Sequence, residues 1–442
     1  MKRCRKYLRM DFRGYRNKVK NGTKTLLKGG FFHILTGNFL NKAISMISSI
    51  VIARVIDKSV YASISYADNL YSYLSLVAGL GMSSALLKFC STDQRKSLDK
   101  AYFNFAMKIG GVVQFIGSIG ICFLVMFWDI PYSSARIFTW SLLLYPLLDL
   151  VTATISIYMR TQLENKMYAA VGVIKSVALC VISIVLILAI GTAGVIPARY
   201  ISLVIVLIYS WRYYKRTLSG IEPDRLTHKQ KKAFVYMALS LCVANFFSGI
   251  MPINETFLVN NLIRDEIITA NFRVAGLLPQ LLLLVSGAVT VYYFPIVARL
   301  KDKRIIKKKV VEIAIVNAVV IILLTVLGMI FTPLAIYILY GSKYMDAVSI
   351  SYLLWIMRAS NCVIRLVPIN MLPAIGKTGF NLYMSIISCV MQCVIDYFCI
   401  KNFGIRGVAV GAIVVYIVTG ILYWVYFLYC CKEKEVKVNK ND

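Results

Sequence analysis

The segment RLKDKRIIKKK, residues 299–309, runs directly into VVEIAIVNAVVIILLTVLGMIFTPLA, residues 310–335. The first part carries seven Lys and Arg, whereas the second contains a single charged residue, Glu312. About 20 helical residues cross a bilayer core about 30 Å thick, so the second part is long enough to span it. Basic residues next to a span are retained on the cytoplasmic side. The segment therefore predicts a transmembrane helix that begins at the cytoplasmic face.

Apolar runs of similar length occur twelve times in the 442-residue chain. Hydrophobic residues make up 59% of the sequence and charged residues 16%, compared with about 25% charged residues in a soluble domain. We therefore predict an all-α polytopic membrane protein with twelve transmembrane helices. The spans are expected at residues 31–54, 61–87, 102–127, 137–159, 168–190, 194–212, 233–259, 269–298, 310–335, 347–373, 379–400 and 405–430.

The distribution of Lys and Arg predicts the orientation of these spans. Thirty-six of the 50 cations fall at the two ends and in or close to every second gap between apolar runs, and eight fall in or close to the alternate gaps. This bias predicts that both termini are cytoplasmic. The net charge of +30 is explained by contact of these loops with anionic lipid headgroups, so no nucleic-acid partner is predicted.

The chain is expected to contain two six-helix halves. GTAGV at 191–195 and GIRGV at 404–408 open the sixth and twelfth spans, at an offset of 213 residues. A match at the same ordinal helix of each half favours a parallel repeat, which is typical of transporters. The predicted organisation is a basic cytoplasmic N-terminal segment, an N-lobe with helices 1–6, a cytoplasmic linker, a C-lobe with helices 7–12 and a cytoplasmic tail, at residues 1–28, 29–213, 214–232, 233–431 and 432–442.

The remaining six cations lie inside the predicted spans, where the positive-inside rule does not explain them: Lys42, Lys108, Lys175, Arg273, Arg358 and Arg365. A charged side chain that faces lipid is costly, so charges within spans are candidates for function. The excess of cations suits an anionic cargo, and the arginine fork suits phosphate. The predicted substrate-binding residues are Lys42, Arg358, Arg365, Lys108, Lys175, Asn41 and Asn38. For Lys108 and Lys175 the sequence leaves open whether they line a cavity or snorkel to headgroups.

Acids within spans are candidates for coupling or gating. Asp68 lies at about the depth of Lys42, so an ion pair between them is expected to lower the cost of both charges. Asp149 lies near the midplane, whereas Glu255, Arg273 and Asp396 lie toward the outer ends, where they either form a gate or reach interfacial water. The predicted coupling or gating residues are Asp68, Asp149, Glu255, Arg273 and Asp396. The sequence leaves open coupling to a proton, a sodium ion or the membrane potential.

The tenth span is unusual because it combines two arginines with two prolines. Arg358 and Arg365 are seven residues apart, so both are expected to point the same way. Pro368 and Pro373 then interrupt the helix, as expected where backbone lines a cavity rather than lipid.

The sequence offers no catalytic or metal-binding constellation. Its 11 cysteines show no paired spacing, and Cys389 and Cys393, which share a helix face, have no histidine nearby. The two histidines, His33 and His228, lie far apart in sequence. No enzyme activity, metal or cofactor is therefore predicted.

Three segments resemble the polysaccharide flippase branch of the multidrug/oligosaccharidyl-lipid/polysaccharide exporter superfamily, the exporters of O-antigen or capsule repeat units. RVIDKSVYA at 54–62, leading to AGLG at 78–81, is similar to the family's turn between helices 1 and 2, with Asp57 and Ala62 where glycine is more frequent. LYGSKYMDA at 339–347 is similar to the family's entry into helix 10. The stretch from AIGK at 374–377 to NFGIRGVA at 402–409 is the closest match, with Asp396 in place of the usual asparagine.

The resemblance implies two six-helix lobes around a central cavity that opens to each side of the membrane in turn. It also implies a lipid-linked substrate, undecaprenyl diphosphate with a short oligosaccharide, moved to the outer leaflet for polysaccharide biosynthesis. Membrane lipids and other polysaccharide-assembly proteins are the expected partners. One alternative is a multidrug/cation antiporter of the same superfamily, which the cationic interior disfavours. The other is a membrane polysaccharide polymerase or ligase, which the short outer connections disfavour.

Overall fold

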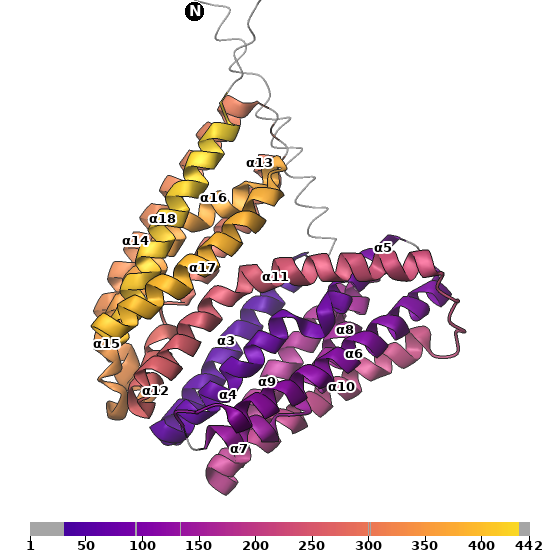
Figure 1. Cartoon of the computed structure of the whole chain (residues 1–442), viewed down its shortest axis with the longest axis horizontal. Coiled ribbons are helices and arrows are strands. Elements are labelled where there is room, and N and C mark those ends of the chain that lie inside the picture. Colours follow the sequence, from indigo (N-terminus) through magenta and orange to yellow (C-terminus); the bar gives the residue numbers. More distant parts are fainter. Residues whose placement is uncertain (1–30, 93–94, 133, 299, 301, 433–442) are drawn as a thin grey trace, which may run out of the picture. The chain divides into compact units, whose positions relative to one another are not determined.

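The computed structural model describes residues 31–432 except 93, 94, 133, 299 and 301. This part of the chain is helical throughout and contains no strand (Figure 1). The α-helices are α3 Phe31–Val55, α4 Lys58–Leu76, α5 Met82–Thr92, α6 Lys96–Phe127, α7 Ala135–Ser141, α8 Tyr145–Thr161, α9 Asn165–Ile190, α10 Val195–Leu218, α11 His228–Ile263, α12 Glu266–Leu277, α13 Leu281–Ala298, α14 Lys303–Tyr340, α15 Ala347–Ser360, α16 Leu366–Met371, α17 Thr378–Phe403 and α18 Ile405–Cys430. Short 3₁₀ helices lie at Ala78–Gly81, Gly191–Gly194, Ser342–Tyr344 and Pro373–Ile375, and a π-helix lies at Asn361–Arg365.

The helices are those of a multi-pass membrane protein. Eight continuous stretches are long and apolar enough to cross a bilayer, and two bent pairs raise the number to ten. One of the eight, Asn165–Leu218, is 54 residues long and holds two of the predicted spans. The first predicted span coincides with α3. The predicted all-α polytopic fold is therefore confirmed, and the described helices are compatible with twelve spans.

The helix α14 shows how the opening segment forms its span. Asp302 is the N-cap, and its carboxylate accepts hydrogen bonds from the backbone N–H groups of Arg304, at 2.8 Å, and Ile305, at 3.4 Å. The helix ends at Gly341, which has a φ of 83° that other residues rarely adopt. The helix thus begins seven residues before the predicted apolar run, because its first two turns are built from the basic residues that precede that run.

By the packing of its backbone, the chain divides into two compact units. The described part of unit 1 comprises residues 31–49, 78–116 and 144–241, and that of unit 2 comprises 50–77, 117–143 and 242–432. In unit 1, α8 packs against α5, α9 and α10; in unit 2, α14 packs against α13 and α15, and α18 against α15 and α17 (Figure 1). These units are not bounded by residues 214–232, and the division into two six-helix halves stays a prediction.

The glycine turns that suggested an internal repeat have the same local structure. Gly191, after α9, has φ 65° and ψ −142°, and Gly404, after α17, has φ 58° and ψ −141°. A Cβ on Gly194 would meet the carbonyl group of Leu186, and a Cβ on Gly407 would clash with the carbonyl group of Cys399. Both helices before the turn are 26 residues long and start 213 residues apart. The two helical hairpins, α9–α10 and α17–α18, therefore share one local design, which supports the predicted parallel repeat.

Replacing Gly407 by alanine is expected to destabilise the protein by about 1–3 kcal/mol, because the added methyl group overlaps the backbone of Cys399. The measurement is the thermal unfolding midpoint of the purified protein in detergent. Gly287→Ala is the matched control, since Gly287 lies in α13 of the same unit and a Cβ there meets no atom within 4 Å. Equal midpoints for the two variants would contradict the role assigned to Gly407.

Candidate functional site

A buried carboxylate and its partners form a four-helix cluster in unit 2. Glu255 of α11 is 2% exposed, and its Oε2 accepts a hydrogen bond from the guanidinium of Arg358 of α15 at 3.2 Å. Its Oε1 accepts from the hydroxyl of Tyr416 of α18 at 2.8 Å and from the amide of Gln392 of α17 at 3.2 Å. Both carboxylate oxygens are thus satisfied, as a buried ion pair requires. Glu255 is therefore not an interfacial residue but the centre of this cluster.

Asp396 lies one helical turn after Gln392 on α17 and is fully buried. Neither carboxylate oxygen has a hydrogen-bond partner among the described residues. The side chain lies against Gly411 of α18, where a Cβ would clash with its Oδ1. A buried carboxyl group without a partner is costly in an apolar environment. Asp396 is therefore a buried acid that the described residues leave unpaired.

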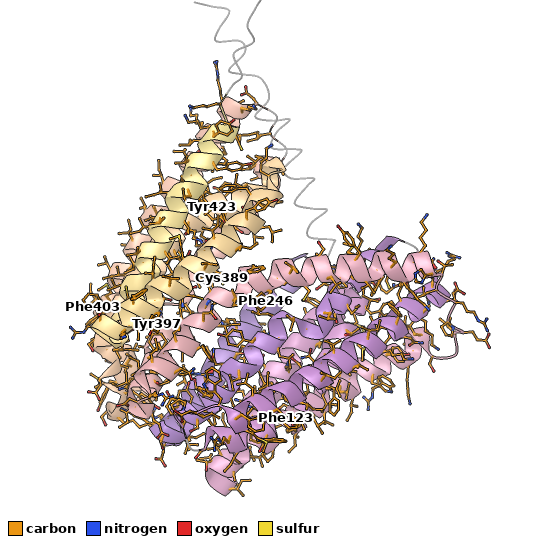
Figure 2. The ribbon with its side chains drawn as sticks, viewed as in Figure 1. Phe123, Phe246, Cys389, Tyr397, Phe403 and Tyr423 are labelled. Atoms are coloured by element: carbon orange, nitrogen blue, oxygen red, sulfur yellow. The ribbon has the colours of Figure 1, made fainter. Side chains whose placement is uncertain are left out.

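Arg365 lies in the same unit but lacks an acidic partner in the part of the chain that the structure describes. Its guanidinium is placed over the ring of Tyr416, 5.7 Å from the centroid, and near the ring of Tyr423, at 6.0 Å. One terminal nitrogen is 3.6 Å from the sulfur of Met251, and the buried Nε has no hydrogen-bond partner among the described residues. Figure 2 labels Tyr423 on α18. Arg358 also reaches Tyr416, at 3.4 Å from its hydroxyl, so both arginines of this span approach α18.

The break in the arginine-bearing span is a π-helix at Asn361–Arg365, which precedes Pro368. Its carbonyl groups are held by side chains from two other helices. The indole of Trp424 donates to the carbonyl oxygen of Ile364 at 2.9 Å, and the amide of Asn317 donates to that of Cys362 at 2.9 Å. A π-turn inside an α-helix often marks a functional position. Here it sets the position of Arg365.

A second ion pair in unit 2 joins α4 and α12, which pack against each other. Arg273 donates to Oδ2 of Asp68 at 3.2 Å and also contacts Ser65, and it lies 5.4 Å from the ring centroid of Tyr61. The partner of Asp68 is thus Arg273 rather than Lys42, which the sequence suggested. Equal depth in the bilayer does not determine which faces of two helices meet, and here α12 supplies the cation.

Unit 1 has its own polar cluster, formed by α3, α8 and α9. Lys175 donates to the carboxylate of Asp149, and the neighbouring Ser176 donates to Asn41. Lys175 therefore forms an ion pair within the helix bundle rather than snorkelling to the membrane surface. Lys42, next to Asn41, is exposed. The side chain of Asn38 lies outside the described residues.

Lys108 of α6 lines a pocket of about 660 Å³ in unit 1. Apolar residues of α6, among them Phe105 and Val112, form one wall, and Lys231 and Asp224 lie on the other. Asp224 accepts a hydrogen bond from Ser97 at 3.0 Å, which ties the linker to the start of α6. Lys108 is therefore a pocket residue, and whether it lines a substrate cavity or snorkels to headgroups stays open.

The family of the chain follows from a match over most of its length. The family model described as "Polysaccharide biosynthesis protein" matches residues 26–301. The chain belongs to the polysaccharide biosynthesis protein family. A comparison with curated proteins gives no significant match.

Solved structures place this polysaccharide biosynthesis protein in a known transporter fold. It is similar to a multidrug resistance MATE family transporter of the MOP superfamily in an inward-facing conformation, with a TM-score of 0.72, 14% identity, and coverage of 88% of this chain and 94% of that chain. It is also similar to an outward-facing structure of such a transporter, with a TM-score of 0.63, 16% identity, and coverage of 90% of this chain and 94% of that chain. A third similar structure is a MOP superfamily transporter from Pyrococcus furiosus that is described as having a binding pocket of reverse polarity. Its TM-score is 0.62 at 15% identity, with coverage of 90% of this chain and 94% of that chain. At these identities the likeness shows the fold alone.

The charges of this polysaccharide biosynthesis protein can now be sorted by partner. Lys175, Arg273 and Arg358 are each neutralised by a carboxylate. Lys42, Lys108 and Arg365 have no ion pair among the described residues. Tyr416 and Gln392 were not predicted as site residues, because tyrosine resembles other apolar residues in a span and Gln392 stands alone between hydrophobic neighbours. Groups of three or more potential metal ligands are absent from the described part of the chain.

Proposed function

We propose that this protein is a flippase that moves undecaprenyl-diphosphate-linked oligosaccharide units from the cytoplasmic to the outer leaflet, as a step in surface polysaccharide biosynthesis such as that of O-antigen. It would act in the bacterial inner membrane with both termini cytoplasmic, by alternating access. The family match supports a role in polysaccharide biosynthesis, and the MATE-like fold supports transport through the membrane.

The observation that carries the proposal is the unneutralised guanidinium of Arg365. A charge in a membrane span without a counter-ion is costly, so a partner is expected at some stage of the working cycle. The neighbouring acid, Glu255, is already occupied by Arg358, Tyr416 and Gln392. A diphosphate supplies the missing anion, and arginine binds phosphate through two parallel hydrogen bonds. Arg365 is therefore the proposed anchor of the substrate.

Lys42 and Lys108 are the proposed secondary anion sites, and Asn41 beside Lys42 adds a polar group that suits a sugar hydroxyl. Outward movement of an anion is favoured by an inside-negative potential, by about 2.3 kcal/mol per charge per 100 mV. The membrane potential therefore contributes to the direction of transport.

Coupling and gating are assigned to the acids and their partners. Asp396 is the proposed site at which a proton or sodium ion enters the cycle, because its carboxylate lacks a partner. Three ion pairs are proposed to form in one conformation of the transport cycle and to break in another: Asp68–Arg273, Asp149–Lys175 and Glu255–Arg358. An ion pair that is formed in one state and broken in the other biases the equilibrium between them.

A multidrug/cation antiporter is the second candidate. The MATE family structures favour it, and so does Asp396, because a cation-binding site needs a free acid. The two candidates differ in the sign of the charge that contacts the cargo. An antiporter would use Asp396 for its substrate and would not require Arg365.

The experiment is analysis of lipid-linked saccharides after deletion of the gene. For a flippase, intact lipid-linked units are expected to accumulate on the inner leaflet, and a plasmid copy of the gene restores the normal level. If the protein were a polymerase or ligase, single units would still reach the outer surface. If it were a drug antiporter, the lipid-linked saccharides would not change, and sensitivity to organic cations would rise.

A further inference from the structure

Unit 2 contains a pocket of about 780 Å³ that the proposed transport function does not use. It lies where the end of α13, the start of α14, the 3₁₀ helix Pro373–Ile375 and the end of α18 meet. These helix ends carry basic clusters that the sequence assigns to the cytoplasmic face. The pocket thus opens at the predicted boundary between bilayer and cytoplasm.

The lining of this pocket is positively charged. Lys303, Lys377 and Lys432 contribute from three separate segments, and none of the lining residues is acidic. Lys303 donates to the carbonyl oxygen of Lys432 at 3.2 Å, which fixes the start of α14 next to the end of α18. Asp302, which precedes Lys303, is occupied as the N-cap of α14. Among the described residues, the three ammonium groups therefore have no carboxylate partner in the pocket.

Aromatic and apolar residues continue the pocket toward the membrane. The ring of Tyr426 stacks on Phe380 of α17, with centroids 3.8 Å apart, and forms a rigid wall. Tyr429 lines the mouth, and Val425 and Leu422 expose an apolar stripe further along α18. Tyrosine is enriched at the headgroup level of membranes. A ligand with a phosphate at one end and an acyl chain at the other fits both parts.

We propose that this pocket binds the phosphate headgroup of an anionic glycerophospholipid, with the acyl chains against the exposed stripe of α18. Basic pockets between helices on the cytoplasmic side of a membrane are a known form of lipid recognition. The lipid would bridge α14 and α18 and hold their cytoplasmic ends together.

The test uses the full-length protein purified in mild detergent. Native mass spectrometry counts the lipids retained from mixtures of phosphatidylglycerol or cardiolipin with phosphatidylcholine. The test variant carries Lys303→Gln, Lys377→Gln and Lys432→Gln. The control variant carries Lys166→Gln, Lys229→Gln and Lys232→Gln, which removes the same charge from exposed lysines of the predicted cytoplasmic face outside the pocket. Size-exclusion chromatography checks that both variants are monodisperse.

The wild type and the control are expected to retain at least one anionic lipid in preference to phosphatidylcholine. Each lysine near a headgroup is worth about fivefold in affinity, so the test variant is expected to bind about 100-fold more weakly. Three results would overturn the proposal. They are an unchanged preference in the test variant, an equal loss in the control, and displacement of the lipid by inorganic phosphate at equimolar concentration, which would indicate a site for soluble anions.

Discussion

Replacement of Arg365 by alanine is expected to reduce export of lipid-linked saccharide by about 10- to 100-fold while leaving the protein folded. A hydrogen bond to a charged group contributes about 1.5–3 kcal/mol, and its loss weakens the bound substrate by that factor. Arg365→Lys keeps the charge but not the fork, so it is expected to restore only part of the activity. The measurement is the amount of lipid-linked saccharide on the inner leaflet of a deletion strain that carries each variant.

The fold should tolerate this change because Arg365 has no carboxylate partner among the described residues. Removal of Arg365 therefore leaves no acid without its counter-ion. Removal of one member of a buried ion pair, in contrast, leaves the other charge buried and uncompensated. A control is available in Arg264, whose guanidinium contacts the exposed carboxylate of Asp129 at 2.7 Å. An exposed ion pair is worth about 0–1 kcal/mol, so Arg264→Ala is expected to export normally. Normal export by Arg365→Ala would contradict the proposal that Arg365 binds the anionic substrate.

The second large effect is expected at Glu255. Glu255→Ala leaves the buried guanidinium of Arg358 without its counter-ion, and breaking a buried pair in this way costs about 3–5 kcal/mol. This cost is a large part of the free energy of unfolding of a typical protein, which is about 5–15 kcal/mol. We therefore expect a severe loss of folded protein, measured as the monodisperse fraction in size-exclusion chromatography and as the thermal unfolding midpoint.

Removal of both charges separates the structural role of this pair from a role in gating. The double variant Glu255→Gln, Arg358→Met removes both charges of the pair and leaves neither without its counter-ion, so its yield is expected to recover toward that of the wild type. Its export rate then reports whether the pair contributes to the transport cycle. A wild-type unfolding midpoint for Glu255→Ala alone would show that the cluster does not stabilise the fold.

The sequence was sufficient to predict an all-α polytopic fold, because the length of an apolar run and its flanking charge are local properties of the chain. It was also sufficient to find the glycine turns at Gly191 and Gly404, whose backbone angles agree within a few degrees. The partners of the buried charges were harder to predict. The partner of Asp68 depends on which face of α12 meets α4, and the 1.5 Å rise per residue gives depth but not rotation about the helix axis.

The predicted excess of intramembrane cations also needed the structure for its interpretation. Arg273 and Arg358 count as cations in the sequence, but each is neutralised by an acid from a distant segment. The prolines at 368 and 373 correctly marked an irregular span, yet the π-helix that positions Arg365 precedes both of them. Tyr416, which contacts both arginines and Glu255, carries no sequence signal that separates it from other aromatic residues.

The shared register of the two glycine-linked hairpins has a consequence for Asp396. A shift of 213 residues places Asp396 of α17 on Ser183 of α9, and Gly411, which packs against Asp396, on Ala198 of α10. Ser183 and Ala198 are both buried. In the hairpin α9–α10, these two positions hold a serine and an alanine, whereas in α17–α18 they hold a larger aspartate and a glycine. The larger side chain on α17 is thus matched by a smaller one on α18. The aspartate is therefore a feature of one hairpin only, although the two hairpins share the same turn. The absence of a side chain at Gly411 leaves the space that Asp396 occupies.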